Sequence, residues 1–242
     1  MKPFVYTFPN GHTAQAIRVY QIAKLSPALR ELGIYYPRPT IVLVGGASGV
    51  SGEELTHLHR FFVKVLATLA ESSGAAIIDG GTDAGVMQLM GQARAEIKAI
   101  FPLIGVAATG TIALSLDVLA RPHNELLEPH HSHFMLVPGS QWGDESSWIA
   151  DVADELAGQK PSVTVLVNGG EIAWDDIAES VRATRPVIVI EGSGRTADTL
   201  ASAMRGEQVS GRAQKLIASG LLHTIDPADG FKSITRALKK YL

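Results

Sequence analysis

The chain has 242 residues, of which 46% are hydrophobic, and carries 21 Lys and Arg against 24 Asp and Glu, a net charge of −3. This balance lacks the basic excess with which duplex nucleic-acid binders neutralise phosphates, so we expect no partner of that kind. The absence of cysteine excludes disulfides and thiolate chemistry and is compatible with a reducing compartment. No apolar run approaches the roughly 20 residues of a membrane span, so we expect a cytoplasmic protein with no membrane partner.

The first forty residues contain an expected edge strand at 4–8 and a helix-like stretch at 13–33, in which Pro27 should kink or divide the helix. No repeat, low-complexity tract or long linker follows. We therefore expect a single domain over 1–242.

Short apolar runs rich in β-branched residues then recur without polar alternation, which is typical of strands buried on both faces of a parallel sheet. They cover 40–44, 75–79, 102–108, 133–137, 162–167, 186–190 and 221–225. Helix-compatible stretches separate them, the longest at 53–74, which should end at Gly74. The pattern predicts an α/β fold: a doubly wound, mainly parallel sheet of about seven strands with helices on both faces.

Five of these strands run directly into glycine clusters. The clusters are GGASGVSGEE (45–54), GGTDAG (80–85), PGSQWGDE (138–145), NGGE (168–171) and EGSGRTAD (191–198). Because parallel strands point the same way, all five turns should lie at one edge of the sheet, where open α/β sheets bind ligands. Glycine lets backbone N–H groups approach an anion, and the following helix N-terminus favours it. Tight turn geometry alone is the alternative explanation for each single cluster.

The last cluster is the best placed for a phosphate. Arg195 supplies a fixed charge beside the hydroxyls of Ser193 and Thr196, which together could hold a diphosphate. In the first cluster Ser51 and Glu54 match a capping box, which would occupy the free N–H groups of the helix start and repel a phosphate. Neither a P-loop nor a G-x-G-x-x-G fingerprint is present, which disfavours ATP hydrolysis by that route and hydride transfer.

The segments IIDGGTDAGVMQLMGQAR, GVAATGTI, HHSHFMLV and VIVIEGSGRTADTLA resemble the amino-terminal cytosolic region of melastatin-type TRP channels. More closely, the chain resembles the stand-alone prokaryotic relatives of that region in the SLOG superfamily of Rossmann-like nucleotide-binding domains. The resemblance covers roughly 38–225 and leaves 1–37 as an N-terminal extension. It implies a Rossmann-like fold and a sensor of nucleotide-derived ligands, with ADP-ribose or a related dinucleotide favoured, because in some channel members the corresponding cleft binds ADP-ribose.

The resemblance also implies roles for individual residues. Gly80 to Asp83 would line the cleft, Arg94 would reach into it from the next helix, and Arg195 would meet phosphates with its neighbouring glycines. With the turns identified by spacing, the expected ligand-binding set is Gly45, Gly46, Ser48, Gly49, Gly80, Gly81, Thr82, Asp83, Arg94, Gly169, Gly170, Glu191, Gly192, Ser193, Gly194, Arg195 and Thr196. We expect no cofactor beyond this ligand, and we expect self-association as a homodimer, as is common among SLOG relatives, with an effector protein as a further partner.

A nucleotide-processing hydrolase that cleaves an N-glycosidic or phosphate bond is the first alternative. The phosphoribohydrolase branch of the superfamily carries P-G-G-x-G-T-x-x-E, whose Glu acts in cleavage; here VNGGEIAWDDI keeps Gly169 and Gly170 but lacks the G-T and the spaced Glu. Glu171, Asp175 and Asp176 are acidic candidates without that spacing, and no catalytic residue is assigned. The second alternative is a structural oligomerisation domain with a vestigial cleft.

Histidines are concentrated in HNELLEPHHSHF, which holds His123, His130, His131 and His133. Along an extended strand His131 and His133 would point the same way and, with Glu128, could supply three metal ligands. We favour structural roles for them and expect no metal. Asp79 could accept from a ribose hydroxyl or cap its own turn, and Glu191 could do either or pair with Arg195.

Overall fold

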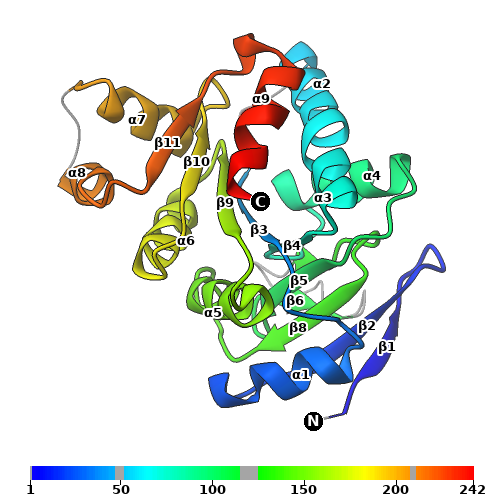
Figure 1. Ribbon diagram of the computed structural model, residues 1–242. Helices are drawn as coiled ribbons and strands as arrows, with labels where there is room; N and C mark the ends of the chain where they lie inside the picture. The colour runs from blue at the N-terminus through cyan, green and yellow to red at the C-terminus, as the bar shows by residue number, and fades with distance from the viewer. Residues whose placement is uncertain (1, 47–51, 115–124, 208–210) are drawn as a thin grey trace.

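The computed structural model describes residues 2–46, 52–114, 125–207 and 211–242 (Figure 1). The strands are β1 (Phe4–Thr7), β2 (Thr13–Arg18), β3 (Thr40–Gly45), β4 (Ala76–Asp79), β5 (Leu103–Ala108), β6 (Ile112–Ala113), β7 (Glu125–Leu126), β8 (His133–Val137), β9 (Ser162–Val167), β10 (Val187–Ile190) and β11 (Leu222–Ile225). The α-helices are α1 (Leu25–Glu31), α2 (Gly52–Phe61), α3 (Thr68–Ser73), α4 (Gly85–Glu96), α5 (Ser146–Ala157), α6 (Glu171–Arg182), α7 (Arg195–Met204), α8 (Gly211–Ile217) and α9 (Phe231–Leu238). A π-helical segment, η2 (Phe62–Ala67), joins α2 to α3, and short 3-10 turns are η1 (Ile22–Lys24), η4 (Pro227–Asp229) and η5 (Lys239–Tyr241).

Nine strands form one sheet in the order β1-β2-β8-β5-β4-β3-β9-β10-β11. All of them run parallel except β1, which pairs antiparallel with β2 at the edge (Figure 1). The seven strands expected from the β-branched runs are present, and so is the expected edge strand, here β1. Over the described residues the sheet therefore has nine strands, where the sequence predicted about seven.

The ninth strand corrects one prediction. Residues 13–18 form β2, not the start of a helix, and β2 lies beside β8 with Gln15 opposite His133. Ala14 and Ala16 are buried while Thr13 and Gln15 are exposed, so the burial of these four residues has the period of a strand. Helix α1 begins only at Leu25, which places Pro27 in the first turn, where backbone N–H groups need no helical acceptor and no kink follows.

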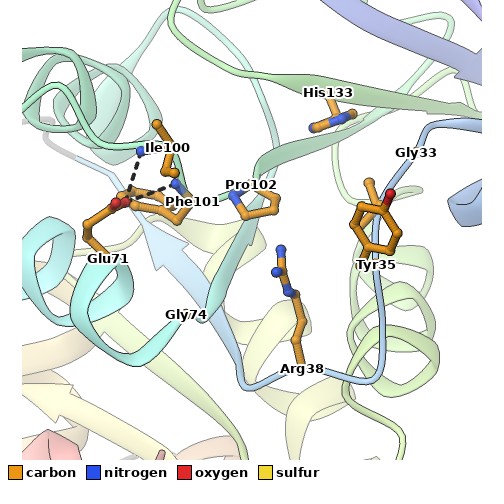
Figure 2. A pocket seen from close by; sticks show the side chains of 10 residues that line it. Gly33, Tyr35, Arg38, Glu71, Gly74, Ile100, Phe101, Pro102 and His133 are labelled. Atoms are coloured by element: carbon orange, nitrogen blue, oxygen red, sulfur yellow. Dashed lines mark hydrogen bonds between the residues drawn. The ribbon is translucent and has the colours of Figure 1, made fainter.

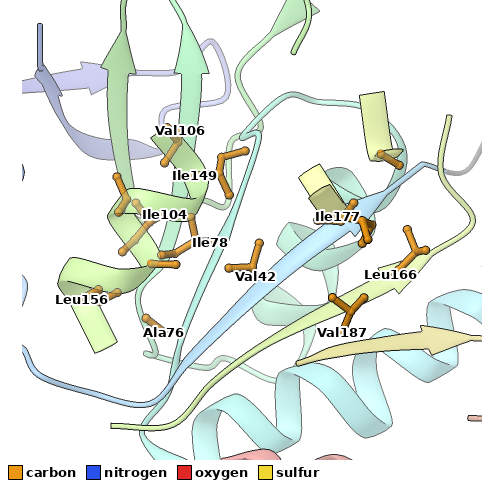
Figure 3. Packing of buried hydrophobic residues seen from close by; sticks show 14 of the residues in the cluster. Val42, Ala76, Ile78, Ile104, Val106, Ile149, Leu156, Leu166, Ile177 and Val187 are labelled. Atoms are coloured by element: carbon orange, nitrogen blue, oxygen red, sulfur yellow. The ribbon is translucent and has the colours of Figure 1, made fainter. Parts of the chain in front are cut away.

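Helices cover both faces of the sheet, as expected. On one face α1, α5, α6, α7 and α8 pack against strand residues such as Val42, Ile78 and Ile104, and Figure 3 shows Ile149 and Leu156 of α5 meeting them. On the other face lie α4, α9 and the long helix formed by α2, η2 and α3. That helix ends at Gly74, which is left-handed with φ of 65°, as its sequence predicts. No helix within the described ranges combines the length and apolar character needed to cross a bilayer.

Strands β3 and β9 are neighbours in the sheet, but the helices that follow them lie on opposite faces. The chain winds from β3 outward through β4 and β5 in one direction and from β9 through β10 and β11 in the other. This arrangement is a topological switch point, and the carboxyl ends of β3 and β9 flank it. Open α/β sheets bind ligands at such a switch point, so the turns beyond these two strands are the place to look for a site.

Candidate functional site

The five glycine turns follow β3, β4, β8, β9 and β10, which are mutually parallel. Their carboxyl ends therefore face the same edge of the sheet, as the sequence predicted, and this edge is called the glycine edge below. Ser48, Gly49 and Ser51 in the first turn lie outside the described residues.

Gly45 and Gly46 lie where β3 ends beside β9. A Cβ on Gly45 would stand 1.8 Å from the carbonyl oxygen of Val167, so only glycine allows the two strands to approach this closely. The N–H of Gly46 donates to the same oxygen at 3.2 Å. Gly45 thus has a packing reason to be glycine, independent of any ligand.

The turns after β9 and β10 are joined by polar contacts. The N–H of Asn168 donates to Ser193 Oγ at 2.8 Å, and Asn168 Nδ2 donates to the Ser193 carbonyl at 2.9 Å. The buried Thr196 hydroxyl lies 3.1 Å from the carbonyl oxygens of both Gly169 and Gly170 and donates to them. Ser193 and Thr196, expected to face a phosphate, therefore hold the two turns together and fix the geometry of the edge.

Arg195 lies between the two helix starts that these turns create. Gly170 is the N-cap of α6 and Gly194 that of α7, and a Cβ on Gly170 would lie 3.4 Å from both terminal nitrogens of Arg195. The guanidinium is exposed, and among the described residues it has neither a hydrogen-bond partner nor a carboxylate at ion-pair distance. The edge thus presents an unneutralised cation beside two helix N-termini.

Glu191 pairs with Arg205 and not with Arg195, which leaves the Arg195 charge uncompensated. The exposed Gly192 donates its N–H to Asp198 Oδ1 at 2.7 Å, so the side chain of Asp198 caps this turn. Glu191 to Thr196 are thereby brought together with Gly169 and Gly170.

The GGTDAG turn is tied down more tightly than the sequence suggested. Gly81 is left-handed with φ of 71°, and a Cβ on it would lie 2.7 Å from the Cα of Gly105 in the neighbouring strand. Thr82 is buried and bridges to Leu127, and the N–H of Asp83 donates to the carbonyl of residue 126 at 2.8 Å. A Cβ built on Gly80 would meet no atom within 4 Å, so a ligand could approach the backbone of this turn there.

Beneath this turn lies a buried ionic chain that sequence reasoning did not identify. His131 donates from Nε2 to Asp79 Oδ1 at 2.9 Å and from Nδ1 to Glu128 Oε2 at 2.8 Å. Burial alone would lower the pKa of His131, but the charges and hydrogen bonds of Asp79 and Glu128 raise it to about 9. Burial opposes ionisation of Glu128, yet hydrogen bonds from His131 and His130 lower its pKa overall. Asp79 also accepts from the N–H of Gly81 at 2.8 Å and so caps its own turn.

Of the three residues that could have formed a metal site, His131 and Glu128 are in contact, but His133 is not brought together with them. His131 precedes β8 and is bound on both nitrogens, whereas His133 begins β8 and its Nδ1 lies 2.8 Å from Ser132 Oγ. His123 lies outside the described residues. Within the described ranges no group of three His, Asp or Glu side chains has the geometry to hold a metal ion.

Arg94 is placed away from the glycine edge. Its Nε donates to the carbonyl of Phe101 at 2.9 Å and its Nη1 to that of His130 at 3.1 Å. Helix α4 starts at the glycine edge and runs back along the strands, so its last turn, which carries Arg94, reaches the amino ends of the sheet. The structure therefore does not bring Arg94 together with the turns.

The acidic candidates at 171–176 are engaged elsewhere. Glu171 and Asp175 both pair with Arg212 of α8. Asp176 is directed into the protein near Glu145 at the start of α5, and burial raises its pKa to about 7, with the charge of Glu145 adding to the effect. The pKa of Glu145 is raised by burial as well.

The winding and the glycine edge define a Rossmann-like α/β domain with its topological switch point between β3 and β9. The family model described as SLOG in TRPM, prokaryote, matches residues 38–235. The chain belongs to this family, which confirms the resemblance found in its motifs.

Curated relatives that the chain resembles are ion channels. It is 28% identical over 204 residues to transient receptor potential cation channel subfamily M member 2 of Mus musculus, covering 70% of this chain and 13% of the channel. It is 26% identical over 209 residues to subfamily M member-like 2 of Nematostella vectensis, covering 71% and 13%. Against subfamily M member 6 of Homo sapiens it is 27% identical over 226 residues, covering 79% and 11%. The chain thus spans about an eighth of the length of the relatives it matches.

Proposed function

We propose that this chain binds a nucleotide-derived anion, ADP-ribose or a related dinucleotide, at the glycine edge between the turns after β9 and β10. The observation that carries the proposal is the exposed, unpaired guanidinium of Arg195 between the N-caps Gly170 and Gly194. An arginine fork and two helix N-termini are complementary to the paired charges of a diphosphate. Membership of a superfamily of Rossmann-like nucleotide-binding domains supports the same class of ligand.

The backbone at Arg195 supports a binding role. Its φ is 46°, in the left-handed region that favours glycine. A non-glycine residue there costs roughly 1 to 2 kcal/mol. Strain of this kind persists where the position of a side chain matters for function.

In this proposal the protein acts as a cytoplasmic sensor. It forms a homodimer, and occupancy of the glycine edge changes its association with an effector protein. The charged turns that would contact the ligand are exposed at Gly192 and Arg195, so a partner could distinguish the bound from the free form.

The test is a calorimetric titration of ADP-ribose into the whole chain, its Arg195→Ala variant and an Arg182→Ala control. Arg182 is an exposed arginine at the far end of α6, already paired with Glu179 and Asp151. We expect a saturable one-site isotherm for the parent. Arg195→Ala should bind about ten- to a hundred-fold more weakly, the worth of a charge-assisted hydrogen bond, and Arg182→Ala should bind like the parent.

Three outcomes would contradict the proposal. Equal affinity of the parent and Arg195→Ala, with both folded by circular dichroism, would remove the arginine from the site. Absence of heat at two temperatures would exclude ADP-ribose as the ligand. Heat that continues at a steady rate after each injection would indicate turnover and favour the hydrolase alternative.

A further inference from the structure

A pocket lies at the edge of the sheet opposite the glycine edge, beside the amino ends of β3, β4, β5 and β8 (Figure 2). Its volume is about 350 Å³, within the range of pockets that hold small molecules. Residues that line it include Ile34, Tyr35, Arg38, Phe101, Pro102 and His133. None of them belongs to the glycine edge, so the pocket is a separate candidate site.

Arg38 carries a positive charge into this pocket that no described carboxylate neutralises. Figure 2 shows its side chain extending into the space between Pro102, Tyr35 and His133. Its Nε is buried without a hydrogen-bond partner, and among the described residues no carboxylate pairs with its guanidinium. Burial lowers the pKa of Arg38, which records the cost of keeping this charge away from water. A half-buried guanidinium in this state is stabilised by an anion.

The other titratable groups around the pocket leave this charge uncompensated. Glu71 accepts from the N–H groups of Ile100 and Phe101 at 2.9 and 3.0 Å, so its carboxylate is held on the pocket wall, as the dashed lines in Figure 2 show. Burial, followed by the charges of Arg94 and Arg38, lowers the pKa of His133 to about 4, which leaves the imidazole neutral at pH 7.

Arg94 contributes to the field but is already bound to two backbone carbonyls. Together these groups offer one free positive charge, which matches a carboxylate better than a phosphate dianion.

The rest of the pocket is apolar. Ile34, Phe101 and Pro102 form its walls, and two large side chains stand exposed beside it, Tyr35 at 86% and Ile100 at 83% of their surface. A ligand with an apolar body would cover these surfaces while its charged end reached Arg38. We propose that the pocket binds a small organic monoanion, a carboxylate carried on an apolar ring or short chain, with Arg38 as its ion-pair partner.

The experiment follows backbone amide resonances of the whole chain by NMR during titration with benzoate and, separately, with benzamide, its uncharged counterpart of nearly the same shape. Benzoate at up to about 10 mM should shift the resonances of 34–38 and 100–103 in a saturable manner, as expected for a weak site. Benzamide should shift them at least ten-fold less strongly. This comparison requires no variant, so it does not depend on how a substitution affects folding.

Variants then test the named partner. Arg38→Gln should weaken benzoate at least ten-fold, whereas Arg236→Gln, at an exposed arginine on α9, should leave binding unchanged. Inorganic phosphate should compete weakly. Equal binding of benzamide, no saturable shift with benzoate, full affinity in a folded Arg38→Gln variant, or phosphate binding more tightly than benzoate would each overturn the proposal.

Discussion

Asp79 and His131, 52 residues apart in sequence, meet in the interior with Oδ1 and Nε2 separated by 2.9 Å. Asp79 ends β4 and caps the GGTDAG turn, while His131 lies in the segment that leads into β8. Their contact, extended by Glu128, anchors that segment beneath the glycine edge. The first two predictions concern this chain of charges.

Replacing His131 should destabilise the protein strongly. His131→Gln removes the buried cation that pairs with both Asp79 and Glu128, and breaking a buried ion pair in this way typically costs about 3 to 5 kcal/mol. His130→Gln is the matched control, because His130 binds the same Glu128 from a partly exposed position and should cost about 1 kcal/mol or less. Urea denaturation at pH 7 measures both, and equal losses would contradict the central role of His131.

The same histidine predicts a pH dependence. Its pKa is about 9 in the folded protein against an ordinary value of 6.5. A raised folded pKa means that the stabilisation is fully present below pH 6.5 and is lost as pH rises through 9. The free energy of unfolding should therefore fall between pH 6.5 and 9 in the parent. Over that range a flatter profile is expected for His131→Gln, and parallel profiles would contradict the assignment.

The contribution of Asp176 to stability should change with pH in the direction opposite to that of a typical surface carboxylate. Burial raises its pKa from 3.8 to about 7, so its neutral form suits the fold, and its contribution is fully present below pH 3.8 and lost as pH rises through 7. Asp176→Asn should therefore raise stability at pH 8 by more than about 1 kcal/mol and change little at pH 4. The adjacent Asp175→Asn, which removes an exposed ion pair with Arg212, should give no such gain. Thermal unfolding of both variants and the parent at pH 4 and pH 8 measures these changes, and an equal gain in the two variants at pH 8 would contradict the role of Asp176.

Gly91 provides a packing test. It lies inside α4, where alanine would normally stabilise a helix, but a Cβ there would stand 2.0 Å from Glu128 Oε2. Gly91→Ala should therefore cost about 1 to 3 kcal/mol. Gly211→Ala, at a helical glycine with open space around it, should stay within about 0.5 kcal/mol of the parent. A stabilising Gly91→Ala would show that Glu128 moves freely.

The side chain of Arg195 should lower the stability of the protein and strengthen ligand binding. Arg195→Gly removes a side chain from a residue with φ of 46° and should raise the free energy of unfolding by about 1 kcal/mol, while it weakens ADP-ribose as Arg195→Ala does. Arg205→Gly, at the end of the same helix with φ of −79°, should lower stability. Denaturant titration of the three chains provides the comparison, and a loss of stability in Arg195→Gly would argue against backbone strain.

The central strands could be predicted from the sequence because their continuous β-branched runs are typical of strands buried on both faces. Such a run indicates a strand whichever neighbours pair with it. Prediction from the sequence failed at 13–18, where alanines and glutamine favour a helix and pairing with β1 on one side and β8 on the other makes the strand preferable. Tertiary pairing overrode local propensity there.

Part of the candidate site could likewise be predicted from the sequence, and part could not. Parallel strands were enough to place the five glycine turns at one edge, since that follows from strand direction alone. The pairing of Asp79 with His131 and the direction of Arg94 depend on how α4 and the segment before β8 pack, which spacing does not encode. A glycine in mid-helix at Gly91 was the one local sign that something large lies against α4.

The hairpin of β1 and β2 has a consequence for the order in which the protein assembles. Beyond the hairpin itself, its only neighbour among the described strands of the sheet is β8, which begins at His133, far along the chain from the end of β2 at Arg18. The hairpin must therefore wait, with the buried faces of Ala14 and Ile17 uncovered, until β8 is in place. Closing such a long loop is slow, so docking of the N-terminal hairpin is expected to be a late event in folding, and the newly made chain is most exposed to aggregation before it occurs.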